Sequence, residues 1–246
     1  MAEIYDQLKQ SLAAEELVAL ATVVGGPGMG SKLLVWPDGR SEGNLESPPL
    51  RDHILSRADQ LLAEQRSELA TFDLDDDSAT CFIEVYPPPP KLIMVGAVHV
   101  SIPLTTFAKE MGFRTIVVDA RGVFATPERF PHADELVVRW PAEALREMAL
   151  NESTCIVFLT HDEKFDYPGL QVALNRPAQY IGALGSTRTH AKRVKALKEL
   201  GVTDEQIARI HAPIGLDLGA RRPEEIAISI IAEIVAVRNG RDPKQA

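Results

Sequence analysis

The chain has 246 residues, 45% of them hydrophobic and 25% charged, a composition typical of a globular protein with one or two domains. Its formal net charge of −9 argues against nonspecific binding to nucleic acid or an anionic membrane, so we expect neither partner. The N-terminus lacks the pattern of a signal peptide, and no apolar run approaches the roughly 18 residues of a membrane span. The two cysteines have neither zinc-site nor redox-pair spacing, and together these absences predict a cytoplasmic protein.

The first 86 residues predict a small domain in which strands outnumber helices. Apolar residues recur at helical spacing in two segments and form short apolar runs in the others. We expect helices over 2–15 and 50–66, strands over 17–24, 32–36, 69–74 and 81–86, and a short strand or loop over 41–46. This mixture predicts a β-rich α+β domain.

Four consecutive prolines, residues 87–90, form the clearest boundary in the sequence. A run of prolines adopts a stiff, extended conformation and acts as a spacer between the segments it connects. The sequence therefore predicts a first domain over 1–86, a linker over 87–90 and a second domain over 91–246.

Strand and helix patterns alternate along the second domain. We expect strands over 92–95, 115–118, 135–138, 154–159 and 179–181, helices over 102–111, 141–149, 165–174, 187–200, 204–210 and 224–237, and a short helix or turn over 124–130. Apolar strands that alternate with helices form a parallel sheet covered on both faces. The domain is therefore predicted to be a Rossmann-like, doubly wound parallel α/β sheet.

A glycine turn at Gly96 follows the first strand of this domain. In a dinucleotide-binding turn, three small residues allow the tight bend, the approach of the pyrophosphate and close packing of the next helix. The second of these positions holds Val98, whose side chain would lie where the phosphate lies, although Asp119 stands where an acidic residue would hold a ribose. The pattern disfavours ordinary NAD(P) binding and favours a scaffold that has lost or moved its ligand.

The residues Thr160, His161 and Asp162 follow the fourth predicted strand of the domain. The carboxyl ends of the strands are where open α/β sheets bind ligands. His161 and Asp162 are candidates for acid–base chemistry or metal binding, and His99 would face the same crevice. The alternative is a loop that only caps the next helix, with Asp162 as the N-cap.

A second polar segment follows the fifth predicted strand. Gly185, Ser186 and Arg188 are followed by Lys192 and Arg193 at the start of a helix. Backbone N–H groups, hydroxyls and a guanidinium at a helix start are typical of an anion-binding pocket. The alternative is simple capping by Ser186, with the basic residues solvated.

Several stretches of the second domain resemble the C-terminal Rossmann domain of the XdhC/CoxI family. They are residues 96–100, 112–119, 124–131, 159–162, 182–186 and 211–217. The last of these, the run from His211 to Asp217, is quite specific. The resemblance covers nearly all of 91–246, and it extends more faintly into the first domain.

The resemblance implies a maturation factor for a molybdenum hydroxylase of the xanthine dehydrogenase or carbon monoxide dehydrogenase type, a cofactor-insertion chaperone rather than an enzyme. Such a factor would bind the molybdenum cofactor, assist insertion of its sulfur with a cysteine desulfurase, and deliver it to the apoenzyme. A homodimer is also expected. On this hypothesis the cofactor-binding residues are Gly96, His99, Asp119, His161, Asp162, Gly185, Ser186 and Arg188.

The chain also departs from the family pattern. Val98 replaces the second glycine of Gly-Ala-Gly-His-Val, and the glycine- and cysteine-bearing motifs of the first domain are reduced. Cys81 lies near one expected cysteine and is either a ligand of molybdenum or sulfur or a small buried strand residue. Two alternatives to the accessory role therefore stay open. They are an NAD(P)-dependent oxidoreductase on the same fold and a non-catalytic scaffold that has lost cofactor binding.

Overall fold

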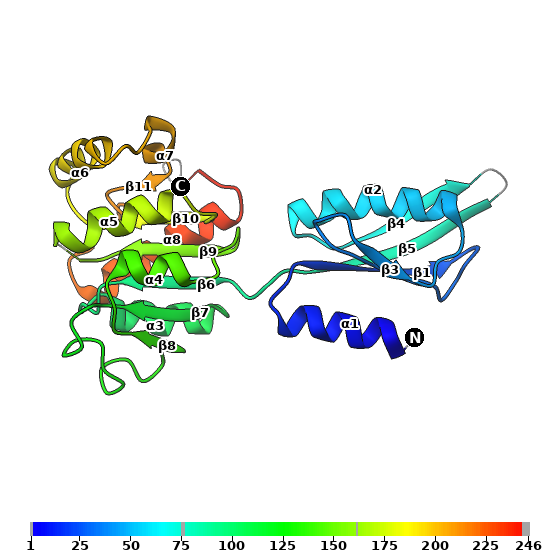
Figure 1. Cartoon of the computed structure of the whole chain (residues 1–246), viewed down its shortest axis with the longest axis horizontal. Coiled ribbons are helices and arrows are strands. Elements are labelled where there is room, and N and C mark those ends of the chain that lie inside the picture. The colour runs from blue at the N-terminus through cyan, green and yellow to red at the C-terminus, as the bar shows by residue number, and fades with distance from the viewer. Residues whose placement is uncertain (1, 75–76, 161, 243–246) are drawn as a thin grey trace. The chain divides into compact units, whose positions relative to one another are not determined.

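A computed structural model describes residues 2–74, 77–160 and 162–242 of the chain. The chain divides into two compact units, with the boundary between Pro88 and Pro89. Each unit has its own sheet (Figure 1). Each also has its own hydrophobic core. No helix in the described part of the chain is long and apolar enough to cross a membrane.

The first unit is built on a five-stranded antiparallel sheet with the strand order β3-β2-β1-β5-β4. Its elements in chain order are α1 (Ala2–Ala13), β1 (Val18–Gly25), β2 (Lys32–Val35), β3 (Ser41–Gly43), α2 (Pro48–Glu64), β4 (Glu68–Leu74) and β5 (Asp77–Tyr86). The predicted β-rich α+β fold of this part is confirmed.

The two helices of this unit cover opposite faces of its sheet. Alternate residues of β1 point to opposite sides, so Ala19 and Ala21 lie in the cluster with Ile54 of α2, whereas Val18 lies in the cluster with Ile4 of α1. The period-2 alternation of β1 therefore serves two cores, which is why the strand is apolar at nearly every position.

The second unit is built on a six-stranded parallel sheet with the order β11-β10-β9-β6-β7-β8. Its strands are β6 (Lys91–Val95), β7 (Arg114–Val118), β8 (Glu135–Val137), β9 (Thr154–Phe158), β10 (Tyr180–Ala183) and β11 (Ile210–His211). Its helices are α3 (Ser101–Glu110), α4 (Pro141–Glu147), α5 (Glu163–Leu174), α6 (Thr187–Glu199), α7 (Asp204–Ala208) and α8 (Pro223–Arg238).

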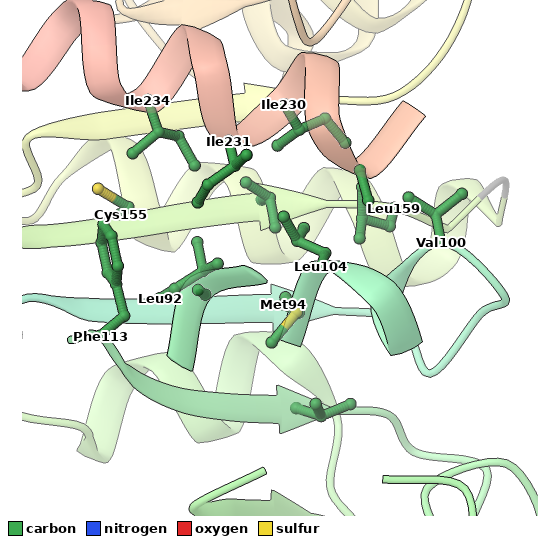
Figure 2. Close-up of a cluster of buried hydrophobic side chains, with 14 of the residues drawn as sticks. Leu92, Met94, Val100, Leu104, Phe113, Cys155, Leu159, Ile230, Ile231 and Ile234 are labelled. Atoms are coloured by element: carbon green, nitrogen blue, oxygen red, sulfur yellow. The ribbon is translucent and has the colours of Figure 1, made fainter. Parts of the chain in front are cut away.

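Helices cover both faces of this parallel sheet. Figure 2 shows one face, where Leu104 of α3 and Ile231 of α8 lie over Leu92 and Met94 of β6. The other face carries α4, α5, α6 and α7, whose apolar side chains form a second buried cluster with the strands. The strand order is that of a dinucleotide-binding Rossmann sheet, so the predicted doubly wound fold is confirmed.

Residues 124–130, expected to form a short helix or a turn, form turns. One expected element differs in the structure. The helix expected over 204–210 ends at Ala208, because Ile210 and His211 leave it to pair with Ile181 and Gly182 as the edge strand β11. A strand of two residues is too short for an apolar periodicity to reveal it.

The order of the strands reverses between β6 and β9, the first and fourth strands of the unit. The loops that follow these two strands therefore leave the sheet in opposite directions and open a crevice at its carboxyl edge, the usual ligand site of such folds. Gly96 follows β6 and Thr160 follows β9, so both lie at this point.

Candidate functional site

The turn after β6 is tightly held at Gly96. This residue has φ +113°, and a Cβ placed on it would lie 2.6 Å from the Cγ2 atom of Thr160. Ser101 donates a hydrogen bond from its hydroxyl to the Gly96 carbonyl at 2.6 Å. Only glycine fits at position 96, because any side chain would meet both a strained backbone and the loop after β9.

Val98 occupies the next part of the turn. It is half-buried and contacts the apolar cluster beneath α3 and α8. It also lines a cavity of about 570 Å³ with Arg121, Thr160, Asp162 and Glu163. We call this space the larger cavity, by comparison with the adjoining smaller cavity described below.

Asp119, at the end of β7, is only 2% exposed and is surrounded by donors. Its Oδ2 accepts the Ala97 N–H at 2.8 Å and Nη2 of Arg121 at 2.8 Å, and its Oδ1 accepts the backbone N–H and Nε of Arg121, both at 2.9 Å. Burial raises the pKa of Asp119, but the bonds from Arg121 and Ala97 bring it below its ordinary value. A direct contact from Asp119 to a ribose would require Arg121 to leave first.

Arg121 is held in place by aromatic rings as well as by Asp119. Its guanidinium lies 4.7 Å from the ring centroid of Phe124 and 5.5 Å from that of Phe165. The side chain is 39% exposed, so it presents a fixed positive charge to the larger cavity that it lines.

The loop after β9 leads into α5. Asp162 is the N-cap, and its Oδ1 accepts the backbone N–H of Lys164 at 3.2 Å, while Thr160 donates from its hydroxyl to Oδ1 of Asp166 at 2.5 Å. Asp162 thus caps the helix and lines the larger cavity at once. His161 lies outside the described residues. His99 is exposed on the glycine turn, and binding roles for both histidines stay predictions.

The turn after β10 begins with Gly185, at φ +137°. Ser186 is the N-cap of α6, and its hydroxyl accepts the Thr189 N–H at 3.2 Å. Arg188 and Thr189 line a cavity of about 270 Å³ between α5 and α6, which we call the smaller cavity. The structure therefore places Arg188 at a cavity wall, whereas the Ser186 hydroxyl is engaged in capping.

Arg193 is buried at the base of the smaller cavity, with 2% of its side chain exposed. Its Nη2 donates to the Leu184 carbonyl at 2.8 Å and lies 3.8 Å from Oδ2 of Asp166. Within the part of the chain that the structure describes, its Nε and Nη1 have no hydrogen-bond partner. Burial lowers the pKa of Arg193, and Asp166 only partly opposes this. The sequence shows Arg193 close to the cationic residues Arg188 and Lys192, but it does not show that Arg193 is buried.

The two cavities adjoin, because Thr160 and Glu163 line both. Together they form a crevice that runs from Val98 and Arg121 at the turns after β6 and β7 to Arg188 at the start of α6. Of the sequence-predicted residues, Asp162 and Arg188 line this crevice, and the other described ones lie on the turns at the same edge, at the ends of neighbouring parallel strands.

Cys81 lies in the first unit and is buried in β5. Burial raises the pKa of its thiol to about 11, so the thiolate that would bind a metal is disfavoured at neutral pH. Among residues 2–74, 77–160 and 162–242, no three His, Cys, Asp or Glu side chains gather as metal ligands. A metal-binding role for Cys81 stays a prediction without geometric support.

A third cavity, of about 730 Å³, lies beside β11. His211 lines it and is joined through Nδ1 to Oε1 of Glu233 at 3.1 Å. Tyr180 donates its hydroxyl to the same carboxylate, and the Gly215 N–H lies 2.6 Å from Oε2. Sequence reasoning missed Tyr180 and Glu233; the one signal was a carboxylate within the apolar run of α8.

Sequence comparison shows the family of the chain. A model of the XdhC Rossmann domain matches residues 92–234, more than half of the chain. The chain belongs to the XdhC and CoxI family. A model named for this family also matches residues 11–73, within the first unit. The predicted family is confirmed.

Two curated proteins are similar to this chain. One, from Bacillus subtilis, is named as a probable subunit of xanthine dehydrogenase and is 34% identical over 66% of this chain and 47% of its own length. The other, the molybdenum cofactor insertion chaperone PaoD of Escherichia coli, is 32% identical over 52% of this chain and 42% of its own length. This chain therefore spans less than half the length of either curated relative.

A solved structure of similar fold is described as a xanthine dehydrogenase from Bacillus halodurans. It matches with a TM-score of 0.56 and 22% identity, over 98% of this chain and 97% of that chain. Identity this low supports the shared fold alone.

Proposed function

We propose that this protein assists the maturation of a molybdenum hydroxylase. It would bind the molybdenum cofactor, or a related phosphorylated ligand, and deliver it to the apoenzyme. The names of the two curated relatives, one for xanthine dehydrogenase and one for a cofactor insertion chaperone, support this role. A cysteine desulfurase partner, a homodimer and a cytoplasmic location belong to the same proposal.

The crevice of the second unit is the observation that carries the proposal. It lies at the carboxyl edge of the sheet, beside the reversal of strand order, and has the fixed charge of Arg121 at one end and Arg188 at the other. An elongated ligand with negative charge fits such a crevice. Gly96 and Gly185 would form the turns beside the ligand, and His99 and His161 would orient it.

The oxidoreductase alternative has the strand order in its favour. Against it stand Val98 in the glycine turn and the engagement of Asp119 by Arg121 and Ala97. A nicotinamide cofactor needs both the pyrophosphate and the ribose contacts that these residues obstruct. The accessory role does not depend on either contact.

The test is to purify the protein from cells that synthesise the molybdenum cofactor. Molybdenum is measured by mass spectrometry and pterin by fluorescence after oxidation. We expect both to co-purify with the wild type, to fall with Arg188→Ala, and to be unchanged with Lys195→Ala, a matched loss of charge on the exposed side of α6. Wild-type protein with no more pterin than an unrelated control protein would refute the proposal.

A further inference from the structure

The smaller cavity differs from the larger one in the charges around it. Three cationic side chains line it, from Arg188, Lys192 and Arg193, together with the carboxylates of Glu163 and Asp166. Its volume of about 270 Å³ lies below the usual range of small-molecule pockets, roughly 300–1,000 Å³. It has room for the charged head of a ligand and not for a whole cofactor.

Arg193 points most directly to a missing anion. A buried charge is costly unless it is both paired and hydrogen-bonded. This guanidinium has one hydrogen bond, to the Leu184 carbonyl, and Asp166 lies 3.8 Å away, while the described residues leave Nε and Nη1 without partners. An anion in the cavity would offset positive charge that the protein neutralises only in part.

The start of α6 also favours an anion in the smaller cavity, for a reason independent of Arg193. The helix has 13 residues, and the N–H groups and dipole at the start of such a helix favour negative charge. Arg188 and Thr189 belong to its first turn, Lys192 follows one turn later, and all three line the cavity. The start of the helix and these cationic side chains thus border the same small space.

Glu163 stands at the junction of the two cavities, because it lines both. Its carboxylate is exposed and would repel an anion placed directly against it. It would, however, accept a hydrogen bond from a hydroxyl group of a ligand that spans the two cavities. The arrangement favours a phosphate that carries a hydroxyl-bearing group over a free phosphate ion.

We propose that the smaller cavity binds the phosphate of a phosphate ester whose hydroxyl-bearing part extends past Glu163 into the larger cavity. Arg193 supplies a fixed charge from below, and Arg188 and Lys192 contact the phosphate from the exposed side. This inference rests on the proposed function only in requiring that a phosphorylated ligand enters the crevice.

Calorimetric titration of the full chain tests the inference with three probes: ribose 5-phosphate, inorganic phosphate and ribose. We expect ribose 5-phosphate to bind most tightly, inorganic phosphate more weakly, and ribose not at all. The double variant Arg188→Ala/Lys192→Ala should weaken both phosphate probes at least about tenfold, the effect of losing one charge-assisted hydrogen bond. Lys195→Ala, the control, should bind as the wild type does.

Two further variants separate the roles within the cavity. Arg193→Lys keeps the charge but loses the planar fork, and it should also weaken both phosphate probes. Glu163→Gln should lower the affinity for ribose 5-phosphate toward that for inorganic phosphate. If Arg193→Lys fails to fold, as judged by circular dichroism, the surface pair Arg188 and Lys192 decides the outcome.

Equal affinities of the wild type for ribose 5-phosphate and inorganic phosphate would overturn the inference, as would equal losses from Lys195→Ala and from the double variant. The proposed function fails separately. Phosphate binding as expected without co-purified pterin would refute the maturation role alone. Pterin retained undiminished by the double variant would refute the phosphate subsite alone.

Discussion

Replacement of Gly96 by alanine should destabilise the second unit sharply. The backbone at φ +113° disfavours any side chain, at about 1–3 kcal/mol for a strained residue. The added Cβ would also lie 2.6 Å from Cγ2 and 3.2 Å from the backbone nitrogen of Thr160. Overpacking of this kind costs roughly 1–3 kcal/mol. We expect a loss of about 2–6 kcal/mol in the free energy of unfolding.

Two further variants divide this loss into its parts. Gly112→Ala is the control for backbone strain, because Gly112 has φ +76° and no atom within 4 Å of the added Cβ, and it should lose only about 1 kcal/mol. Thr160→Ser removes the offending methyl group, so it should cost less in the Gly96→Ala background than in the wild type. Urea unfolding of the wild type, Gly96→Ala, Thr160→Ser and the double variant measures the clash between the two residues as a double-mutant cycle. Gly112→Ala is unfolded in the same way. The reasoning is refuted if Gly96→Ala costs no more than Gly112→Ala.

Three other predictions follow from groups with shifted pKa values and from the glycine turn. Burial raises the pKa of Glu233, but the hydrogen bonds from His211, Tyr180 and Gly215 bring it below its ordinary value. The ionised carboxylate therefore stabilises the fold at neutral pH, and this stabilisation is lost as the pH falls through the folded value. Glu233→Gln should therefore cost about 1–3 kcal/mol at pH 7 and less near pH 3, measured by urea unfolding at each pH; equal losses would contradict this. Burial raises the thiol pKa of Cys81 to about 11 and of Cys155 to about 12, so both should resist a thiol reagent at pH 8 until the protein unfolds; fast labelling of native protein would count against this. Val98→Gly should not create NADH binding in a fluorescence titration, since Asp119 stays engaged by its donors; saturation at micromolar NADH would show otherwise.

The parallel sheet was predictable because its strands are buried on both faces. β6 and β9 are apolar at nearly every position, and each is followed by a helix. Strands joined by helices pair in parallel, which brings their carboxyl ends to one edge, so the sequence could place Asp162 and Arg188 at the edge where the crevice lies. The β-rich character of the first unit was predictable from its apolar runs and from the turn residues between them.

The roles of individual side chains were less predictable, because they depend on groups distant in sequence. Spacing placed Asp119 at a ribose position, but whether its carboxylate is free depends on Arg121, which is itself held by the rings of Phe124 and Phe165. Glu233 and Tyr180 meet across 53 positions of sequence. No local pattern encodes such a contact, since it follows from how α8 lies on the sheet.

Thr160 contacts the glycine turn, Asp166 and both cavities of the crevice. Its methyl group abuts the position of Gly96, its hydroxyl bonds Asp166 beside Arg193, and its side chain separates the two cavities while lining both. A substitution there changes the glycine turn, the acidic partner of the buried guanidinium and both walls together. Loss of binding in a Thr160 variant would therefore show that the crevice matters without showing which half of it holds the ligand, so ligand mapping depends on the charged residues at the two ends.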